Sequence, residues 1–147
     1  MKAHTAHTAR GTFSVQMQPL SESGFGSDSA NLGRLSLDKS FEGDLVGSGK
    51  GETLTAMTTT KGSAGYVAIE RVTGRLQGRS GSFVLQHSGQ MNRGAQRLAI
   101  EIVADSGSGD LAGIEGTLTI RIEAGKHCYE LAYALPELVK SPLAPPR

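Results

Sequence analysis

The chain has 147 residues, with 15 Lys and Arg against 14 Asp and Glu and a formal net charge of +1. This length predicts a single domain, and such a balanced charge is not typical of nucleic-acid-binding proteins, which carry a basic excess. A single cysteine, Cys128, excludes an internal disulfide. Because no apolar run has the length of a secretory signal near the start or of a membrane-spanning helix, we expect a cytoplasmic protein that binds neither nucleic acid nor membranes.

Glycine is the most informative residue type, since 20 glycines are roughly twice the usual share. They are spread between short runs rich in β-branched residues, which is typical of strands joined by tight turns. Four of the five prolines follow Leu135. The expected organisation is therefore a single domain over residues 1–135 with a mobile start at 1–7, followed by a Pro-rich tail at 136–147.

Eight runs alternate apolar and polar residues with a period of two, which predicts strands. They are Thr12–Met17, Leu32–Phe41, Asp44–Met57, Tyr66–Leu76, Ser82–Met91, Gln96–Val103, Thr117–Ile122 and Cys128–Leu135. A turn of helix fits only Ser106–Gly116, whose four glycines disfavour it. The fold class is therefore all-β. Eight antiparallel strands predict an up-and-down β-barrel, and a two-sheet sandwich fits the same pattern equally well.

The third predicted strand carries Gly47, Gly49 and Gly51 on one face. A face without side chains allows a strand to coil sharply or allows another backbone to approach it, as at the corner of a barrel. This strip therefore favours a curved, closed sheet.

Four glycine-containing segments together resemble an uncharacterised bacterial family. The segments are Phe41–Gly47, Gly65–Gly74, Gly78–His87 and Ser106–Gly116. Members of that family look like small barrels related in shape to plant allene oxide cyclase, and the resemblance extends over residues 11–135. It implies an antiparallel barrel that self-associates as a homo-oligomer, and it brings no catalytic residue set. This chain departs from the family at residues 15–18, where relatives often have Trp followed by an acidic residue.

Two polar residues in otherwise apolar strands are the candidate catalytic groups. If the turn after the fourth strand is centred between Gly78 and Arg79, Glu70 and His87 are directly opposed and share a face. A buried carboxylate beside an imidazole is a usual arrangement for acid–base chemistry. A turn shifted by one residue would instead place them on opposite faces, with Gln86 inside and Glu70 paired to an arginine outside.

The same predicted face supplies candidate ligand-binding residues. Tyr66, Phe83 and Leu85 would line an apolar pocket, to which Gln86, Glu101 and Tyr133 could add polar groups. Tyr129 shares a side of the last strand with Tyr133, and both fit packing or a subunit contact better than a ligand site.

Several other motifs do not predict sites. Residues 47–51 resemble a phosphate loop but lack its Ser or Thr and its following helix, and residues 107–113 lack the context of a dinucleotide site. His4 and His7 have no third metal ligand nearby. His127 and its neighbour Cys128 point to opposite faces of a strand, which favours an inert thiol. Five arginines between positions 71 and 97 are typical of solvated strand faces. We therefore expect neither metal nor cofactor.

Three functions remain open on these grounds. The first is a module that binds a small, mainly apolar ligand inside the barrel. The second is a cofactor-free isomerase or cyclase in which Glu70 or His87 moves a proton. The third is a non-catalytic oligomeric structural protein with a solid barrel.

Overall fold

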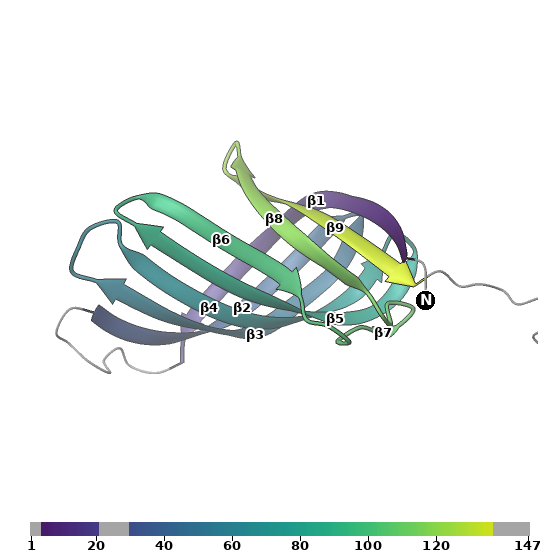
Figure 1. Cartoon of the computed structure of the whole chain (residues 1–147), viewed down its shortest axis with the longest axis horizontal. Coiled ribbons are helices and arrows are strands. Elements are labelled where there is room, and N and C mark those ends of the chain that lie inside the picture. The colour runs from purple at the N-terminus through teal and green to yellow at the C-terminus, as the bar shows by residue number, and fades with distance from the viewer. Residues whose placement is uncertain (1–3, 21–29, 137–147) are drawn as a thin grey trace, which may run out of the picture.

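The computed structural model describes residues 4–20 and 30–136, and the regular elements in these ranges are all strands (Figure 1). Their bounds are β1 His4–Pro19, β2 Ala30–Gly43, β3 Leu45–Thr58, β4 Ala64–Leu76, β5 Arg79–Asn92, β6 Ala95–Ile102, β7 Ser108–Gly109, β8 Glu115–Glu123 and β9 Lys126–Pro136. Among these residues no helix could cross a membrane.

The strands close into one antiparallel barrel. Neighbours around the wall are β1, β2, β3, β4, β5, β6, β8 and β9, and β9 pairs with β1 to complete the circle. The two-residue strand β7 is an addition that pairs with β5 outside this order. The predicted eight-stranded barrel is therefore confirmed, and the sandwich alternative is excluded because the sheet has no second layer.

The first strand begins earlier than the sequence predicted. Residues 4–7 pair with the end of β9, from His4 opposite Pro136 to His7 opposite Tyr133, so they belong to the barrel wall. Residues 1–3 and 137–147 lie outside the described residues, as does nearly all of the predicted tail. The segment expected to hold at most a turn of helix, Ser106–Gly116, instead contains β7, turn residues at 110–113 and the start of β8.

Three of the hairpins turn through two residues, each ending in glycine. Gln77 and Gly78 have φ angles of 47° and 88°. Both residues also have positive φ at Arg93-Gly94 and at Ala124-Gly125. Positive φ at both positions is the signature of the type I′ turn, whose twist matches that of the strands. The turn after β4 is thus centred one residue earlier than predicted. This moves the pairing by two residues, so Glu70 lies opposite Leu85 and not His87, and every side chain keeps its face. The alternative with Glu70 and His87 on opposite faces needs a pairing shift of one residue and is therefore wrong.

The half of the barrel that contains the start of β1 is packed solid. The core comprises Ala9, Phe13, Phe41, Leu45, Val72, Leu76, Phe83, Leu85, Ile100, Ile102, Leu111, Ile114, Leu118, Tyr129, Leu131, Tyr133 and Leu135. Leu111 and Ile114 come from the segment that joins β6 to β8, which lies at that end of the barrel (Figure 1). This segment therefore plugs one end.

The wall is weakest between β6 and β8. Glu101 opposite Thr117 is the single bridge between them within the described residues, whereas β8 pairs with β9 along its whole length. Towards the other end of the barrel the two strands diverge, and Leu98 and Ile122 are 47% and 68% exposed there. Between β6 and β8 the barrel wall is thus closed by this one bridge.

The glycines of β3 allow β4 to approach closely. A Cβ on Gly47 would lie 2.2 Å from the carbonyl oxygen of Thr73, and one on Gly51 would lie 1.8 Å from that of Ile69. Both distances are far below van der Waals contact, so these positions require glycine. The glycines on one face of this strand therefore allow the backbones of β3 and β4 to lie close together in the curved wall.

Replacing Gly47 by Ala should lower the free energy of unfolding by about 1–3 kcal/mol, because the methyl group would push β4 away from β3. Urea denaturation measures this difference. Gly65→Ala is the matched control, since its Cβ would meet its nearest neighbour, the Gly89 oxygen, at 3.7 Å. An equal decrease in unfolding free energy in the two variants would contradict the conclusion that Gly47 is required for the close approach of β3 and β4.

Candidate ligand-binding site

The half of the barrel opposite the plug is hollow. A cavity of about 370 Å³ opens at this end, between the inner faces of β1, β3, β4, β5 and β6. Its apolar lining includes Met17, Met57, Met91 and Leu98, together with the ring of Tyr66. We call this cavity the mouth. Its apolar, unbranched methionine side chains form an adaptable lining for an apolar molecule.

A smaller cavity of about 150 Å³ shares Met17, Thr53 and Tyr66 with the mouth and extends to the packed core. We call it the floor pocket. Its polar lining includes Lys39 and His87, which are 8% and 3% exposed. The apolar mouth thus leads to a small pocket that carries buried polar groups.

Three ionisable residues meet beside the floor pocket. Lys39 Nζ lies 2.8 Å and His87 Nε2 lies 2.6 Å from the same oxygen, Oε1 of Glu70. Glu70 is fully buried. It is not among the residues that line the floor pocket, whereas Lys39 and His87, which both contact its carboxylate, are. A molecule in the pocket would therefore touch Lys39 and His87, and Glu70 would act through them.

A glycine on the strand between them makes this cluster possible. Lys39 on β2 is opposite Gly49 on β3, and Glu70 lies one strand further on β4. A Cβ on Gly49 would lie 2.2 Å from Oε2 of Glu70. The carboxylate therefore occupies the space that a side chain of β3 would fill, and it reaches Lys39 across the bare backbone.

The neighbours of Glu70 favour its charged form. Burial by itself raises the pKa of a carboxyl group, but the hydrogen bond from His87 and the charge and hydrogen bond of Lys39 outweigh this effect, so the pKa of Glu70 is lowered. With the carboxylate ionised, the His87 proton lies on Nε2 and is donated to Oε1.

Lys39 is the member of the cluster that sequence reasoning missed. Its ammonium lies 4.9 Å from the centre of the Phe13 ring and 5.9 Å from that of Phe41, in positions that favour cation–π attraction. Its position in β2 could have indicated that it faces inward, because Lys39 lies two residues from both Leu37 and Phe41 and therefore on the same face. All three side chains are buried. A lysine at an inward position needs a buried counter-charge.

Two buried oxygen atoms near the cavities have no hydrogen-bond partner among the described residues. They are Oγ1 of Thr53 and Oε2 of Glu70. Thr53 is 2% exposed and lines both the mouth and the floor pocket. An unpaired buried hydroxyl costs free energy, so the Thr53 side chain offers a ready hydrogen bond to a polar group in the pocket.

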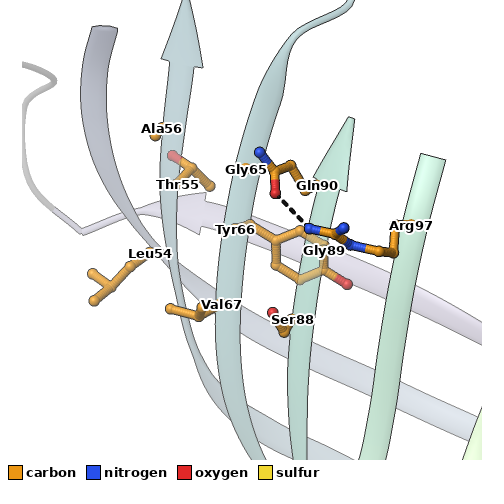
Figure 2. Close-up of a pocket in the computed structure, with 10 residues that line it drawn as sticks. All are labelled: Leu54, Thr55, Ala56, Gly65, Tyr66, Val67, Ser88, Gly89, Gln90 and Arg97. Carbon is orange, nitrogen blue, oxygen red and sulfur yellow. Dashed lines mark hydrogen bonds between the residues drawn. The ribbon is translucent and has the colours of Figure 1, made fainter. Parts of the chain in front are cut away.

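Tyr66 lies at the junction of the two cavities. Figure 2 shows its ring extending from β4 towards Gly89 and Arg97. A Cβ on Gly89 would lie 2.3 Å from this ring, so the absence of a side chain there lets the ring lie flat over β5. Burial, followed by the negative charge of Glu70, raises the pKa of Tyr66. The phenol thus stays protonated at neutral pH and can donate a hydrogen bond.

The structure brings together some of the sequence-predicted site residues. Glu70 and His87 share the interior as diagonal neighbours, and Tyr66 lines both cavities. Phe83 and Leu85 face inward but belong to the packed half. Their place in the core gives neither residue access to the two cavities.

The other polar candidates lie elsewhere. Gln86 and Glu101 are exposed and oppose each other on the outer face of β5 and β6. Tyr133 is buried at the plugged end, where its hydroxyl bonds Gln77 and its ring stacks on His7. This placement does not support the ligand-binding roles predicted for these three residues, because the alternation of β5 and β6 and the position of Tyr133 on β9 keep them away from the cavities.

The remaining polar motifs are structural in this arrangement. Tyr129 accepts a hydrogen bond from the amide of Leu45 and donates to the Glu42 oxygen, which ties β9 to the turn between β2 and β3. His127 lines the floor pocket against Phe13, while Cys128 faces away from it. No group of three metal-binding side chains occurs within residues 4–20 and 30–136.

Replacing Glu70 by Gln should cost about 3 kcal/mol of unfolding free energy at neutral pH, because it leaves the Lys39 charge buried without its partner. The lowered pKa of Glu70 means that its contribution is present above about pH 4.5 and is lost as the pH falls through the folded-state value. The difference in unfolding free energy between wild type and variant should therefore become smaller in acid. Urea denaturation at a series of pH values from neutral to acid measures this difference.

Glu130→Gln is the matched control, because Glu130 pairs with Arg10 on the exposed outer face of β1 and β9. Solvent screens this pair, so the variant should change stability far less. A difference for Glu70→Gln that stays constant from neutral pH down to strong acid would contradict the assignment of a buried, ionised carboxylate.

Comparison with known proteins agrees with the fold and names no activity. A family model described as "Protein of unknown function (DUF3224)" matches residues 9–133. The crystal structure of a protein of unknown function from the DUF3224 family of Shewanella oneidensis MR-1 superposes with a TM-score of 0.84 at 49% sequence identity, covering 92% of this chain and 99% of that one. A search of curated proteins finds no match. The resemblance to an uncharacterised bacterial family is thus confirmed, and the chain belongs to the DUF3224 family.

Proposed function

We propose that this protein binds a small, mainly apolar molecule in the hollow half of its barrel. The observation that carries the proposal is that the apolar mouth and the polar floor pocket adjoin, since Met17, Thr53 and Tyr66 line both. Sites for small molecules are typically concave and largely apolar, with a few polar groups that fix orientation. Lys39, Thr53 and His87 are such groups here.

The size of the cavity supports the same proposal. The mouth has a volume of about 370 Å³, which falls within the range of roughly 300–1,000 Å³ that is usual for small-molecule sites. The plug at the other end leaves the mouth as the route by which a ligand would reach the floor pocket.

Catalysis is the second candidate function, and the contact between His87 and Glu70 favours it. Glu70 holds Nε2 of the imidazole, which leaves Nδ1 free to take a proton from a molecule in the floor pocket. An isomerase or cyclase of this kind would use His87 as the acid–base group. Glu70 would position it.

The binding proposal can be tested with the neutral, apolar dye phenylnaphthylamine, whose fluorescence rises in an apolar site. The wild-type protein should bind the dye saturably. Ala64→Trp should weaken binding at least about tenfold, because Ala64 lines the mouth and an indole there would fill it. Fluorescence titration measures both affinities.

Arg71→Trp provides the control, since Arg71 lies on the same strand but faces outward and is exposed. It should leave dye binding unchanged. A wild-type protein that does not bind the dye, or an equal loss in both variants, would refute a site in the barrel. In the catalytic alternative, a ligand recovered after incubation would be chemically altered by wild type and unaltered by His87→Asn.

We also propose that the chain associates with copies of itself through the outer face of β2, β3 and β4. Leu32, Leu54, Val67 and Ile69 are 41–51% exposed there, and Leu54 is directly opposite Val67. Figure 2 shows the side chains of Leu54 and Val67 pointing away from the ring of Tyr66. Arg34 and Glu52 form an ion pair beside these residues, so the face carries both signs of charge and can match a second copy of itself.

Light scattering at micromolar concentration should therefore show an oligomer for the wild-type protein. The double substitution Leu54→Lys with Val67→Lys should produce monomers, because it places charges in the centre of the apolar face. Ile122→Lys alters an exposed apolar residue on β8 and should leave the oligomer intact. A monomeric wild type would overturn the proposal.

A further inference from the structure

We propose that the end of the ligand that reaches the floor pocket is an uncharged hydrogen-bonding group, a hydroxyl or a carbonyl, and that Glu70 sets this preference by cancelling the charge of Lys39. This inference rests on the proposed binding function and deepens it. It makes Glu70 a residue that determines specificity without touching the ligand.

The floor pocket offers hydrogen bonds of both kinds. Lys39 has three N–H groups, and its one hydrogen bond within the described residues goes to Glu70. Thr53 Oγ1 is buried without a partner at the edge of the same pocket. Nδ1 of His87 accepts when Nε2 donates to Glu70. A hydroxyl can both donate to and accept from these groups, and a carbonyl can accept from Lys39.

The same groups carry no net charge. The ammonium of Lys39 and the carboxylate of Glu70 are in contact at 2.8 Å and sum to zero, and an imidazole that holds a single proton, on Nε2, adds no charge. The other ionisable residues that line this pocket are Tyr66 and His127. A ligand carboxylate at this depth would therefore be buried without an uncommitted counter-charge, which is costly.

An anion has an alternative position at the rim of the mouth. Arg97 lines the mouth, where it is exposed and donates a hydrogen bond to Gln90 (Figure 2). A fatty acid could thus bind with its carboxylate outward at Arg97. The two orientations involve different residues, so substitutions can distinguish them.

Decanol and decanoate form a probe pair that differs mainly in the charge of one end. Calorimetric titration at about pH 8, above the range in which histidines usually gain protons, gives the ratio of their affinities. Wild type should bind decanol at least about tenfold more tightly than decanoate. In Glu70→Gln this ratio should fall at least about tenfold, because the Lys39 charge becomes available to the carboxylate.

The double variant Lys39→Gln with Glu70→Gln is the matched control, since it removes both charges and keeps the floor neutral. Its ratio should resemble that of wild type. If Glu70→Gln does not fold, as judged by circular dichroism, the wild type and the double variant still decide the matter. In that case decanol must remain the preferred ligand of both.

Two results would overturn the proposal while leaving the binding function in place. One is tighter binding of decanoate than of decanol by wild type. The other is a ratio that changes in Arg97→Gln and not in Glu70→Gln, which would place the polar end at the rim. Failure of the proposed function looks different, because then neither decanol nor phenylnaphthylamine would bind.

Discussion

The interior of this barrel depends on one ion pair that crosses a strand without side chains. Lys39 and Glu70 lie two strands apart, and their contact exists because Gly49 leaves the intervening backbone bare. A charge of either sign alone in this interior would be strongly unfavourable, so each residue requires the other. Once the pair is formed, it fixes the position of His87, whose Nε2 shares the same oxygen. The glycine therefore supports the packing and the polar chemistry of the site together.

The interior of the barrel has two halves that differ in packing. The half closed by the segment between β6 and β8 holds nearly all the large buried apolar side chains and supplies the hydrophobic stabilisation. The other half keeps a hollow whose methionines and leucine remain partly exposed. The ion pair lies where these halves meet. In the proposed binding mode, a molecule entering from the mouth would therefore reach Lys39 and His87 at the edge of the packed core.

Alternation alone predicted the eight wall strands. It left open whether Glu70 and His87 share a face, because that depends on the register of β4 and β5, which the turn at Gln77-Gly78 sets. The contact of Lys39 with Glu70 could not be predicted in this way, because it joins residues on strands that are not hydrogen-bonded to each other. The division into a packed and a hollow half also escaped prediction, since it depends on Leu111 and Ile114, which come from a glycine-rich connection and not from a strand.

The single bridge between Glu101 and Thr117 has a mechanical consequence. Elsewhere around the described wall, ladders of backbone hydrogen bonds hold each strand at a fixed spacing from the next, and the spacing can change only if a ladder breaks. Beyond this bridge the edges of β6 and β8 are free of one another, so their separation can vary without loss of a hydrogen bond. The circumference of the barrel can therefore change at the open end, where β6 and β8 are not paired, and is fixed at the plugged end.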